Sequence, residues 1–287
     1  MIRSALLALD TTEASAVALE KAIGFCQYFS ARADDSESPI HLTGIGVVDR
    51  SDIKRPKAVP VGATGFKIER DKALLADARR KVETLLDNFQ ARCREAAIPC
   101  STAPCEGSPY EQIERVAHQH DVIFIGRDTN FHFETRDRST DTLKRLLRDH
   151  PRPLIVTPPE DTGKRSIVIA YDGSLQGSRA LHLWALLGLR RVETEIHVIS
   201  VNRRESEAQQ LCDEAMELLS HHEIPATAHP IASSQRAVSV LLERIPELEP
   251  RMIVMGAFGA GGFREHFFGT ATKWMIKNCP YPMFLHH

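Results

Sequence analysis

The feature that most constrains how this chain can fold is an internal repeat, because the same order of apolar runs occurs twice. Three runs of the first half have counterparts in the second: ALLALD (5–10) and IVIAYD (167–172), DVIFIG (121–126) and RMIVMG (251–256), HPRPLIV (150–156) and CPYPMFL (279–285). The first run of each half ends in an aspartate, Asp10 or Asp172, and precedes a helical pattern. We therefore expect two structural units of the same kind in tandem.

The two copies differ in length, and this difference indicates where loops are inserted. Gly126 and Gly256 are 130 positions apart, but Asp10 and Asp172 are 162 apart, so the first copy carries 32 additional positions. Their Pro, Gly, Ser and charge content assigns these to two loops, 31–39 and 50–65. The expected organisation is a first domain at 1–158, a linker at 159–166 and a second domain at 167–287.

Within each copy, short apolar runs alternate with helical patterns. In the second copy we expect strands at 167–172, 195–201, 226–231, 252–256 and 283–285, and helices at 179–189, 206–220, 235–244 and 270–278. Fully apolar strands separated by helices predict a parallel sheet that is covered on both faces. With right-handed crossovers, the α/β chain becomes two tandem doubly wound five-stranded parallel-sheet sandwiches. Trp274 and Met275 are expected on the core face of the last helix.

Composition excludes several classes of function. A hydrophobic content of 43%, a charged content of 26% and a net charge of −2 describe a globular protein without a general attraction to nucleic acid or anionic lipid. The six cysteines form no Cys-x-x-Cys pair and the 13 histidines show no metal-ligand spacing, so we expect reduced thiols and no metal site. The apolar run that stops at Asp10 is too short for a signal peptide or a membrane span. These features predict a cytoplasmic protein with no nucleic-acid or membrane partner.

A glycine-rich loop follows the fourth apolar run of the second copy. Its spacing is Gly256-x-x-Gly259, then nine residues, then Gly269-Thr270 at the start of a helix. Glycine lets main-chain N–H groups approach an anion closely, and a helix N-terminus adds unpaired N–H donors. The loop leaves the sheet at the edge where Asp172 ends the first strand, which is where open α/β sheets bind ligands. The pattern predicts a phosphate site.

Two common phosphate motifs are absent. The only Gly-Lys pair, Gly163-Lys164, has Pro158 where a P-loop needs its first glycine. A dinucleotide fingerprint that began at Gly259 would meet Arg264 in place of its last glycine.

The spacing resembles the nucleotide signature of the universal stress protein family, G-2x-G-9x-G-[ST], which the second copy matches at all four positions. The resemblance covers the whole chain as two tandem domains of adenine nucleotide alpha hydrolase-like fold. It implies a stress-response protein, typically dimeric, that holds ATP together with Mg²⁺. By this resemblance, Gly256, Gly259, Gly269 and Thr270 would hold the triphosphate, Ala257, Phe258 and Ala271 would lend main-chain N–H groups, and Asp172 and Val201 would lie against the adenosine.

The first copy departs from this signature. It keeps Gly126, but has Thr129, Ser139 and Thr140 where the second copy has Gly259, Gly269 and Thr270. Replacing a glycine that needs left-handed geometry costs about 1–2 kcal/mol per residue. We therefore expect the first domain to have lost the nucleotide, and the glycines to serve a ligand rather than the fold. Asp10 is expected only to cap a helix. Asp172 is expected to cap a helix, to lie against the adenosine, or to do both.

Three functional hypotheses follow. The first is an ATP-binding regulatory module with little or no turnover, because no P-loop lysine, arginine finger or general base is recognisable beside the loop. The second is a slow ATPase or self-phosphorylating protein with Thr270 or Thr272 as acceptor, and the third is a nucleotide-free interaction scaffold. No catalytic residue is assigned. The resemblance also suggests an intramolecular pseudo-dimer through the last strands of the two domains, and a homodimer of chains.

Overall fold

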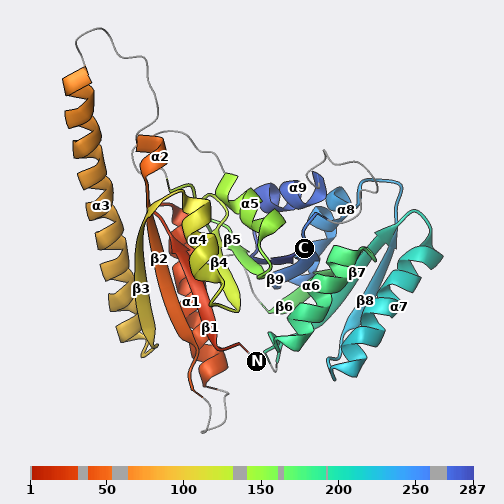
Figure 1. Ribbon diagram of the computed structural model, residues 1–287. Helices are drawn as coiled ribbons and strands as arrows, with labels where there is room; N and C mark the ends of the chain where they lie inside the picture. The colour runs from red at the N-terminus through yellow and green to blue at the C-terminus, as the bar shows by residue number, and fades with distance from the viewer. Residues whose placement is uncertain are drawn as a thin grey trace. The chain divides into compact units, whose positions relative to one another are not determined.

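The computed structural model describes residues 2–31, 38–53, 64–131, 141–160, 165–191, 193–258 and 270–287. The chain divides into two compact units, Arg3–Leu146 and Leu147–His287, the latter joined by the first two residues. Figure 1 shows that each unit is built of strands and helices in alternation. The expected α/β fold class is therefore confirmed.

The unit Arg3–Leu146 is built on four parallel strands in the order β3-β2-β1-β4. The strands are β1 (Ser4–Leu9), β2 (His41–Asp49), β3 (Cys100–Gly107) and β4 (Val122–Gly126). The helices of this part of the chain are α1 (Glu13–Ser30), α2 (Arg50–Ile53), α3 (Thr64–Glu95), α4 (Pro109–Ala117) and α5 (Asp141–Asp149). Strands β1 and β4 are buried almost throughout, as their unbroken apolar sequences predict.

The unit Leu147–His287 has the strand order β5-β10-β9-β6-β7-β8. Its strands are β5 (Leu154–Thr157), β6 (Ser166–Ala170), β7 (Ile196–Asn202), β8 (Thr227–Ala232), β9 (Pro250–Gly256) and β10 (Met283–His286). Its helices are α6 (Leu175–Leu186), α7 (Glu205–His221), α8 (Ala237–Arg244), the short 3₁₀ helix η1 (Ile245–Leu248) and α9 (Thr270–Asn278). Strands β6 to β10 pair in parallel, and β5 pairs antiparallel with β10. The pairing of β5 with β10 lies inside this unit.

The additional positions of the first copy lie partly in regular structure. Helix α3 has 32 residues, whereas its counterpart α7 has 17. The loop expected at 50–65 is wrong at both ends, because residues 50–53 form α2 and α3 begins at Thr64. Most of the remaining inserted positions, 32–37 and 54–63, lie outside the described residues.

The last helix is amphipathic, but its core face is narrower than expected. Met275 is fully buried, as predicted, whereas Trp274 is 50% exposed, so its assignment to the core face is wrong. Neighbouring helix positions point in different directions, and only one of the two can face the sheet. Among the described helices, none has the length and apolar character needed to cross a membrane.

Candidate functional site

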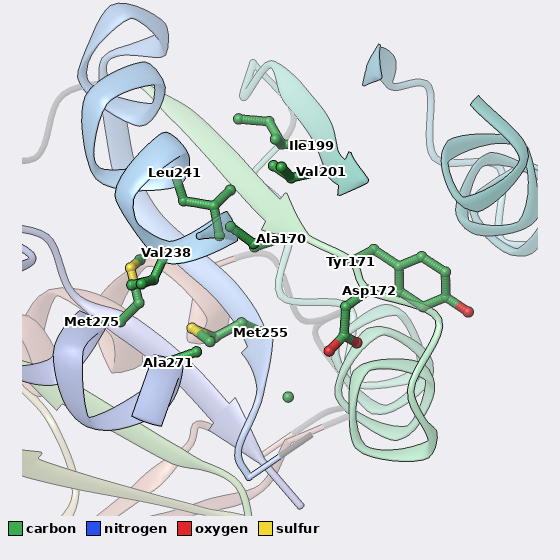
Figure 2. Close-up of a pocket in the computed structure, with 12 residues that line it drawn as sticks. Ala170, Tyr171, Asp172, Ile199, Val201, Val238, Leu241, Met255, Ala271 and Met275 are labelled. Atoms are coloured by element: carbon green, nitrogen blue, oxygen red, sulfur yellow. The ribbon is translucent and has the colours of Figure 1, made fainter. Parts of the chain in front are cut away.

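A pocket lies at the carboxyl edge of the second unit's sheet, between the ends of β6 and β9 (Figure 2). Its lining residues come from β6, β7, α8, β9 and α9 and the segments after them: Ala170, Tyr171, Asp172, Ile199, Val201, Ala237, Val238, Leu241, Met255, Gly256, Ala271 and Met275. Strands β7 and β9 pair on opposite sides of β6, so strand order reverses here. This is the place where doubly wound sheets bind ligands.

Most of the pocket wall is apolar, and the exception is Asp172. Ile199 and Val201 alternate with Ser200 on β7, so they share one face of the sheet with the pocket. In Figure 2 the Asp172 carboxylate turns toward the side of Met255 and Ala271, while the Tyr171 ring points away from the pocket. The arrangement suits a flat apolar group beside one hydrogen-bond acceptor.

Asp172 has a structural role that leaves part of its carboxylate open. Its Oδ1 accepts hydrogen bonds from Ser174 N at 3.0 Å and Ser174 Oγ at 2.6 Å. Ser174 is the N-cap of α6 and accepts from Gly177 N at 3.0 Å. Asp172 therefore orients the capping serine and is not the cap itself. The side chain is exposed, and the described part of the chain offers no hydrogen-bond donor to its Oδ2.

Gly256 is required by the packing of α6 on β9. A Cβ atom there would lie 2.5 Å from Gly177 N and 2.6 Å from the carbonyl carbon of Gln176. Gly126 is confined in the same way, because its Cβ would lie 2.6 Å from the carbonyl carbon of Ala14. The expectation that the glycines serve only a ligand is thus wrong for this position. The first copy keeps Gly126 because the fold needs it.

The main-chain N–H groups expected to face a phosphate are partly engaged within the chain. Ala257 N donates to His286 O at 2.7 Å, and Phe258 N donates to Thr272 Oγ1 at 3.0 Å. Ala271 lies exposed in the first turn of α9 and lines the pocket, where helix N–H groups have no intrahelical acceptor. Gly259 and Gly269 lie outside the described residues, and of Thr270 only the backbone position at the start of α9 is described.

The sequence motif missed the apolar half of the pocket. Val238 and Leu241 of α8 and Met255 and Met275 line it, although Val201 and Ala271 were the apolar lining residues that the motif predicted. Val238 and Leu241 are three positions apart on an eight-residue helix, which places them on one face. That spacing was the available signal, but it does not distinguish a pocket wall from the core.

The corresponding place in the first unit is filled by the chain itself. Asp10 is only 4% exposed. Its Oδ1 accepts from Thr12 N at 2.9 Å and from Thr12 Oγ1 at 2.6 Å, and its Oδ2 accepts from Asn130 N at 2.9 Å. Burial raises the pKa of Asp10, although these hydrogen bonds act in the opposite direction. The expectation that Asp10 only caps a helix is wrong, because Thr12 is the N-cap of α1 and Asp10 orients Thr12 and also binds the loop that follows β4.

In the part of that loop which the structure describes, two residues are buried. Thr129 is fully buried and donates its main-chain N–H to Gly126 O at 3.2 Å. Phe131 is 1% exposed and adopts the left-handed φ of +59°. Ser139 and Thr140, the remaining counterparts of the signature, lie outside the described residues.

One titratable group stands beside Gly256 at the end of β10. His286 pairs with Gly256 in the sheet, and burial, followed by repulsion from His287 and Arg179, lowers the pKa of His286 to about 4. A positive charge is therefore disfavoured at this ring near neutral pH. Within the described ranges, no three His, Cys, Asp or Glu side chains come together in a way that could hold a metal ion.

The fold and the pocket define a class of protein: a tandem repeat of doubly wound α/β units, with one crevice open and the other filled. No protein-family model matches the chain. Universal stress protein Slr1230 of Synechocystis sp. is 21% identical over 254 residues, which cover 88% of this chain and 85% of that protein.

Solved structures extend the likeness over both repeats. A universal stress protein from Archaeoglobus fulgidus superposes with a TM-score of 0.68 at 19% identity, covering 99% of this chain and 97% of that one. A functionally unknown protein from Pseudomonas aeruginosa gives a TM-score of 0.56 at 16% identity, covering 99% and 92%. The resemblance to the universal stress protein family is therefore confirmed, by sequence with one relative and by fold with the solved structures.

Proposed function

We propose that this chain is an ATP-binding regulatory protein of the stress response, which holds one nucleotide in its second unit with little or no turnover. The observation that carries the proposal is the contrast between the two aspartates. Asp172 stands exposed at the rim of an apolar pocket, whereas Asp10 is buried and bound by Thr12 and Asn130. The proposal thus assigns the ligand to one unit.

The nucleoside half of ATP fits the described residues. Ile199, Val201 and Leu241 offer apolar surface for the adenine ring, and the open carboxylate of Asp172 can accept a hydrogen bond from it or from the ribose. Two universal stress proteins among the solved structures carry AMP and cAMP, but their TM-scores of 0.34 are too low to bear on this chain. The assignment therefore rests on the pocket itself.

The triphosphate half would be held by Gly259, Gly269, Thr270 and the first turn of α9 that contains Ala271. A phosphate that also used the N–H groups of Ala257 and Phe258 would have to replace His286 O and Thr272 Oγ1 as their acceptors. Mg²⁺ would bind through the phosphate oxygens, since a magnesium ion needs only one or two protein ligands. When bound, it would neutralise phosphate charge.

The burial and hydrogen bonding of Thr272, one of the two proposed phosphate acceptors, favour binding without turnover over phosphoryl transfer. Thr272 is 2% exposed, and its hydroxyl already accepts the hydrogen bond from Phe258 N. A slow ATPase or self-phosphorylating protein would have to use Thr270 or free the hydroxyl of Thr272. A nucleotide-free scaffold is the remaining alternative. The open pocket in the second unit argues against it.

The partners of this function are also proposals. The antiparallel pairing of β5 with β10 supports a pseudo-dimer of the two repeats through their last strands. We also propose that two chains associate into a homodimer. The sequence contains six cysteines but no Cys-x-x-Cys pair, which supports a location in the reducing cytoplasm.

The test is calorimetric titration of the full chain with ATP and Mg²⁺. We expect one nucleotide per chain, and we expect Asp172→Ala to weaken binding about ten- to a hundredfold, because a hydrogen bond to a charged group contributes about 1.5–3 kcal/mol. Leu175→Ala is the matched control, since Leu175 is 60% exposed near the start of α6 and does not line the pocket. Equal affinities for Asp172→Ala and the control would remove the nucleotide from this pocket. Phosphate release faster than the spontaneous rate would favour the ATPase.

A further inference from the structure

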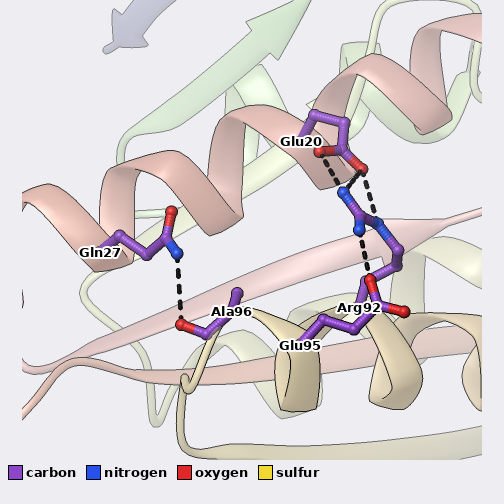
Figure 3. A network of polar contacts seen from close by, with 5 residues as sticks. All are labelled: Glu20, Gln27, Arg92, Glu95 and Ala96. Carbon is purple, nitrogen blue, oxygen red and sulfur yellow. Dashed lines mark hydrogen bonds and ion pairs between the residues drawn. The ribbon is translucent and has the colours of Figure 1, made fainter.

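Two polar clusters outside the proposed nucleotide pocket differ in the groups that meet. In the first unit, Arg92 donates to both carboxylate oxygens of Glu20, at 2.9 and 2.8 Å, and to Glu95 Oε2 at 2.6 Å (Figure 3). Opposite charges meet there, and the contact joins α1 to α3. In the second unit, the rings of His197 and His229 meet instead. Two imidazole rings are ligands that transition-metal ions prefer.

The β7–β8 register holds the two histidines beside each other. His197 is the second residue of β7 and pairs with Thr227, and His229 pairs with Ile199 two positions further along. Because side chains two positions apart on a strand share a face, both rings lie on the same face of the sheet. Their centroids are 5.1 Å apart. The two histidines are separated by 32 positions in the sequence, so no spacing motif reveals them.

The ring nitrogens of this pair face each other at the distance that a shared metal ion needs. Nδ1 of His197 lies 3.1 Å from Nε2 of His229, where a single proton joins two neutral rings. Two metal–nitrogen bonds of about 2.0–2.1 Å place their nitrogens about 2.8–3.0 Å apart at a right angle and about 3.3–3.4 Å apart at the tetrahedral angle. The observed distance lies between these values. A metal ion could therefore replace the proton with only a small shift of the rings.

The surroundings of the two rings favour metal binding. A metal ion binds the neutral imidazole. Burial, followed by repulsion from His197 and Arg244, lowers the pKa of His229, so this ring is neutral near neutral pH. On the other side of the pair, His197 Nε2 lies 3.7 Å from Glu195 Oε2. A carboxylate beside Nε2 favours a proton on that nitrogen and leaves the Nδ1 lone pair for the ion.

The charges and the exposure around the pair also admit a cation. Arg244 opposes a positive ion at His229, but Arg244 Nη1 lies 3.4 Å from Glu247 Oε1, which offsets the charge. His229 is half-buried and the His197 side chain is 13% exposed, so an ion and water can reach both rings. Among the described residues, no third His, Cys, Asp or Glu completes a metal-binding group with them. Water or a small anion must therefore complete the coordination.

We propose that His197 and His229 bind one Zn²⁺ ion, through Nδ1 of His197 and Nε2 of His229. Both rings stay neutral, with their protons on the outer nitrogens, Nε2 of His197 and Nδ1 of His229. Imidazole nitrogen suits zinc, whereas Mg²⁺ prefers oxygen ligands, so this site differs in chemistry from the magnesium proposed at the phosphates. The ion joins β7 to β8 and does not depend on a bound nucleotide.

The experiment titrates ZnCl₂ into the full chain by calorimetry, after dialysis against a chelator and then against chelator-free buffer without nucleotide. We expect one Zn²⁺ per chain. We expect His197→Ala and His229→Ala each to weaken binding about tenfold or more, because each removes one of the two protein ligands and the loss of an outer partner alone costs that much.

His182→Ala is the matched control. His182 is an exposed histidine of α6 whose ring meets that of His222 edge to face, with centroids 5.9 Å apart. This variant should bind zinc like the unchanged chain. No zinc binding by the unchanged chain, or equal affinities for all three variants, would overturn the proposal.

Two further measurements separate loss of the site from loss of the fold. His229→Gln keeps a side chain that can donate a hydrogen bond to His197 Nδ1, so its unfolding midpoint should equal that of the unchanged chain while its zinc affinity falls. X-ray absorption at the zinc edge of the unchanged chain should show two imidazole rings, with oxygen as the remaining ligands. Sulfur ligands would assign the ion to cysteines, and oxygen ligands alone would mean an adventitious ion only. Either result contradicts the proposal.

Discussion

Asp10 and Asp172 follow equivalent strands of the two repeats, and each accepts two hydrogen bonds from a hydroxyl residue two positions later. From there the two places differ. Asp10 also accepts from Asn130 N and is covered by the loop with Thr129 and Phe131. Asp172 remains exposed beside a pocket of apolar side chains. The aspartate therefore holds the start of the helix in the same way in both repeats, although the crevice beside it is closed in one repeat and open in the other.

This comparison separates what the fold needs from what a ligand would need. Both repeats have a glycine at the end of β4 or β9 and an aspartate just after β1 or β6, because both residues contact the start of a helix. The second and third glycines of the signature occur only where the crevice is open. Four experiments test this division, from the largest expected effect to the smallest.

The strand-end glycines should be equally intolerant of a side chain. Gly126→Ala and Gly256→Ala each place a Cβ less than 3 Å from helix backbone, so we expect each to lower the free energy of unfolding by about 1–3 kcal/mol. Urea unfolding followed by circular dichroism measures both, and tryptophan fluorescence reports the second unit, which contains both tryptophans. Gly24→Ala is the control, because a Cβ there meets no atom within 4 Å and the position is helical. A tolerated Gly126→Ala would show that the glycine is not a requirement of the fold.

The two aspartates should differ in their effect on stability. Asp10→Ala leaves the part-buried donors Thr12 N and Asn130 N without this acceptor, and we expect a loss of about 2 kcal/mol in the free energy of unfolding. Asp172→Ala exposes its donors to water, so we expect less than about 1 kcal/mol. The same urea experiment compares them. Similar losses for both would mean that Asn130 does not close the first crevice as described.

The ends of β5 and β10 should give the repeats different responses to pH. His286 stands where the first repeat has Thr157, and its pKa is lowered to about 4 from an unfolded value near 6.5. Between these values the unfolded chain binds more protons, so stability is retained above pH 6.5 and decreases as the pH falls toward 4. We expect His286→Thr to weaken this dependence in thermal unfolding measured across that range. An unchanged pH profile would assign the effect to other groups.

Restoring one glycine should not reopen the first crevice, if the proposed function is correct. Thr129→Gly removes a buried side chain, but Asn130 N still donates its hydrogen bond to the Asp10 carboxylate and Phe131 is still buried. We therefore expect native mass spectrometry in ATP to show one nucleotide per chain, as for the unchanged protein. A second nucleotide in this variant would show that a single glycine decides occupancy.

Much of the fold was predictable because it depends on patterns that survive without tertiary context. The alternation of apolar runs and helical periods placed β7, β8, β9 and α9 to within one or two residues, and the repeat indicated two similar sheets. The central strands β1, β4 and β6 are almost wholly buried, so their sequences carry little besides apolar side chains, whereas β3 and β8 at the sheet ends are partly exposed. The loop expected at 50–65 failed at its ends, where α2 and the first turns of α3 form despite nearby Pro and Gly.

The candidate site was predictable only in part. The sequence by itself determined the repeat, the strand-end aspartates and glycines, and the loss of the signature from the first copy. Only the tertiary structure decided that α6 leaves no room for a side chain at Gly256. It also decided that the N–H groups of Ala257 and Phe258 donate to acceptors within the chain, and that Val238 and Leu241 line the pocket. The physical reason is that hydrogen-bond partners and steric contacts between segments distant in sequence depend on how those segments pack. A periodic pattern fixes which face of an element is apolar, but it does not fix what that face meets.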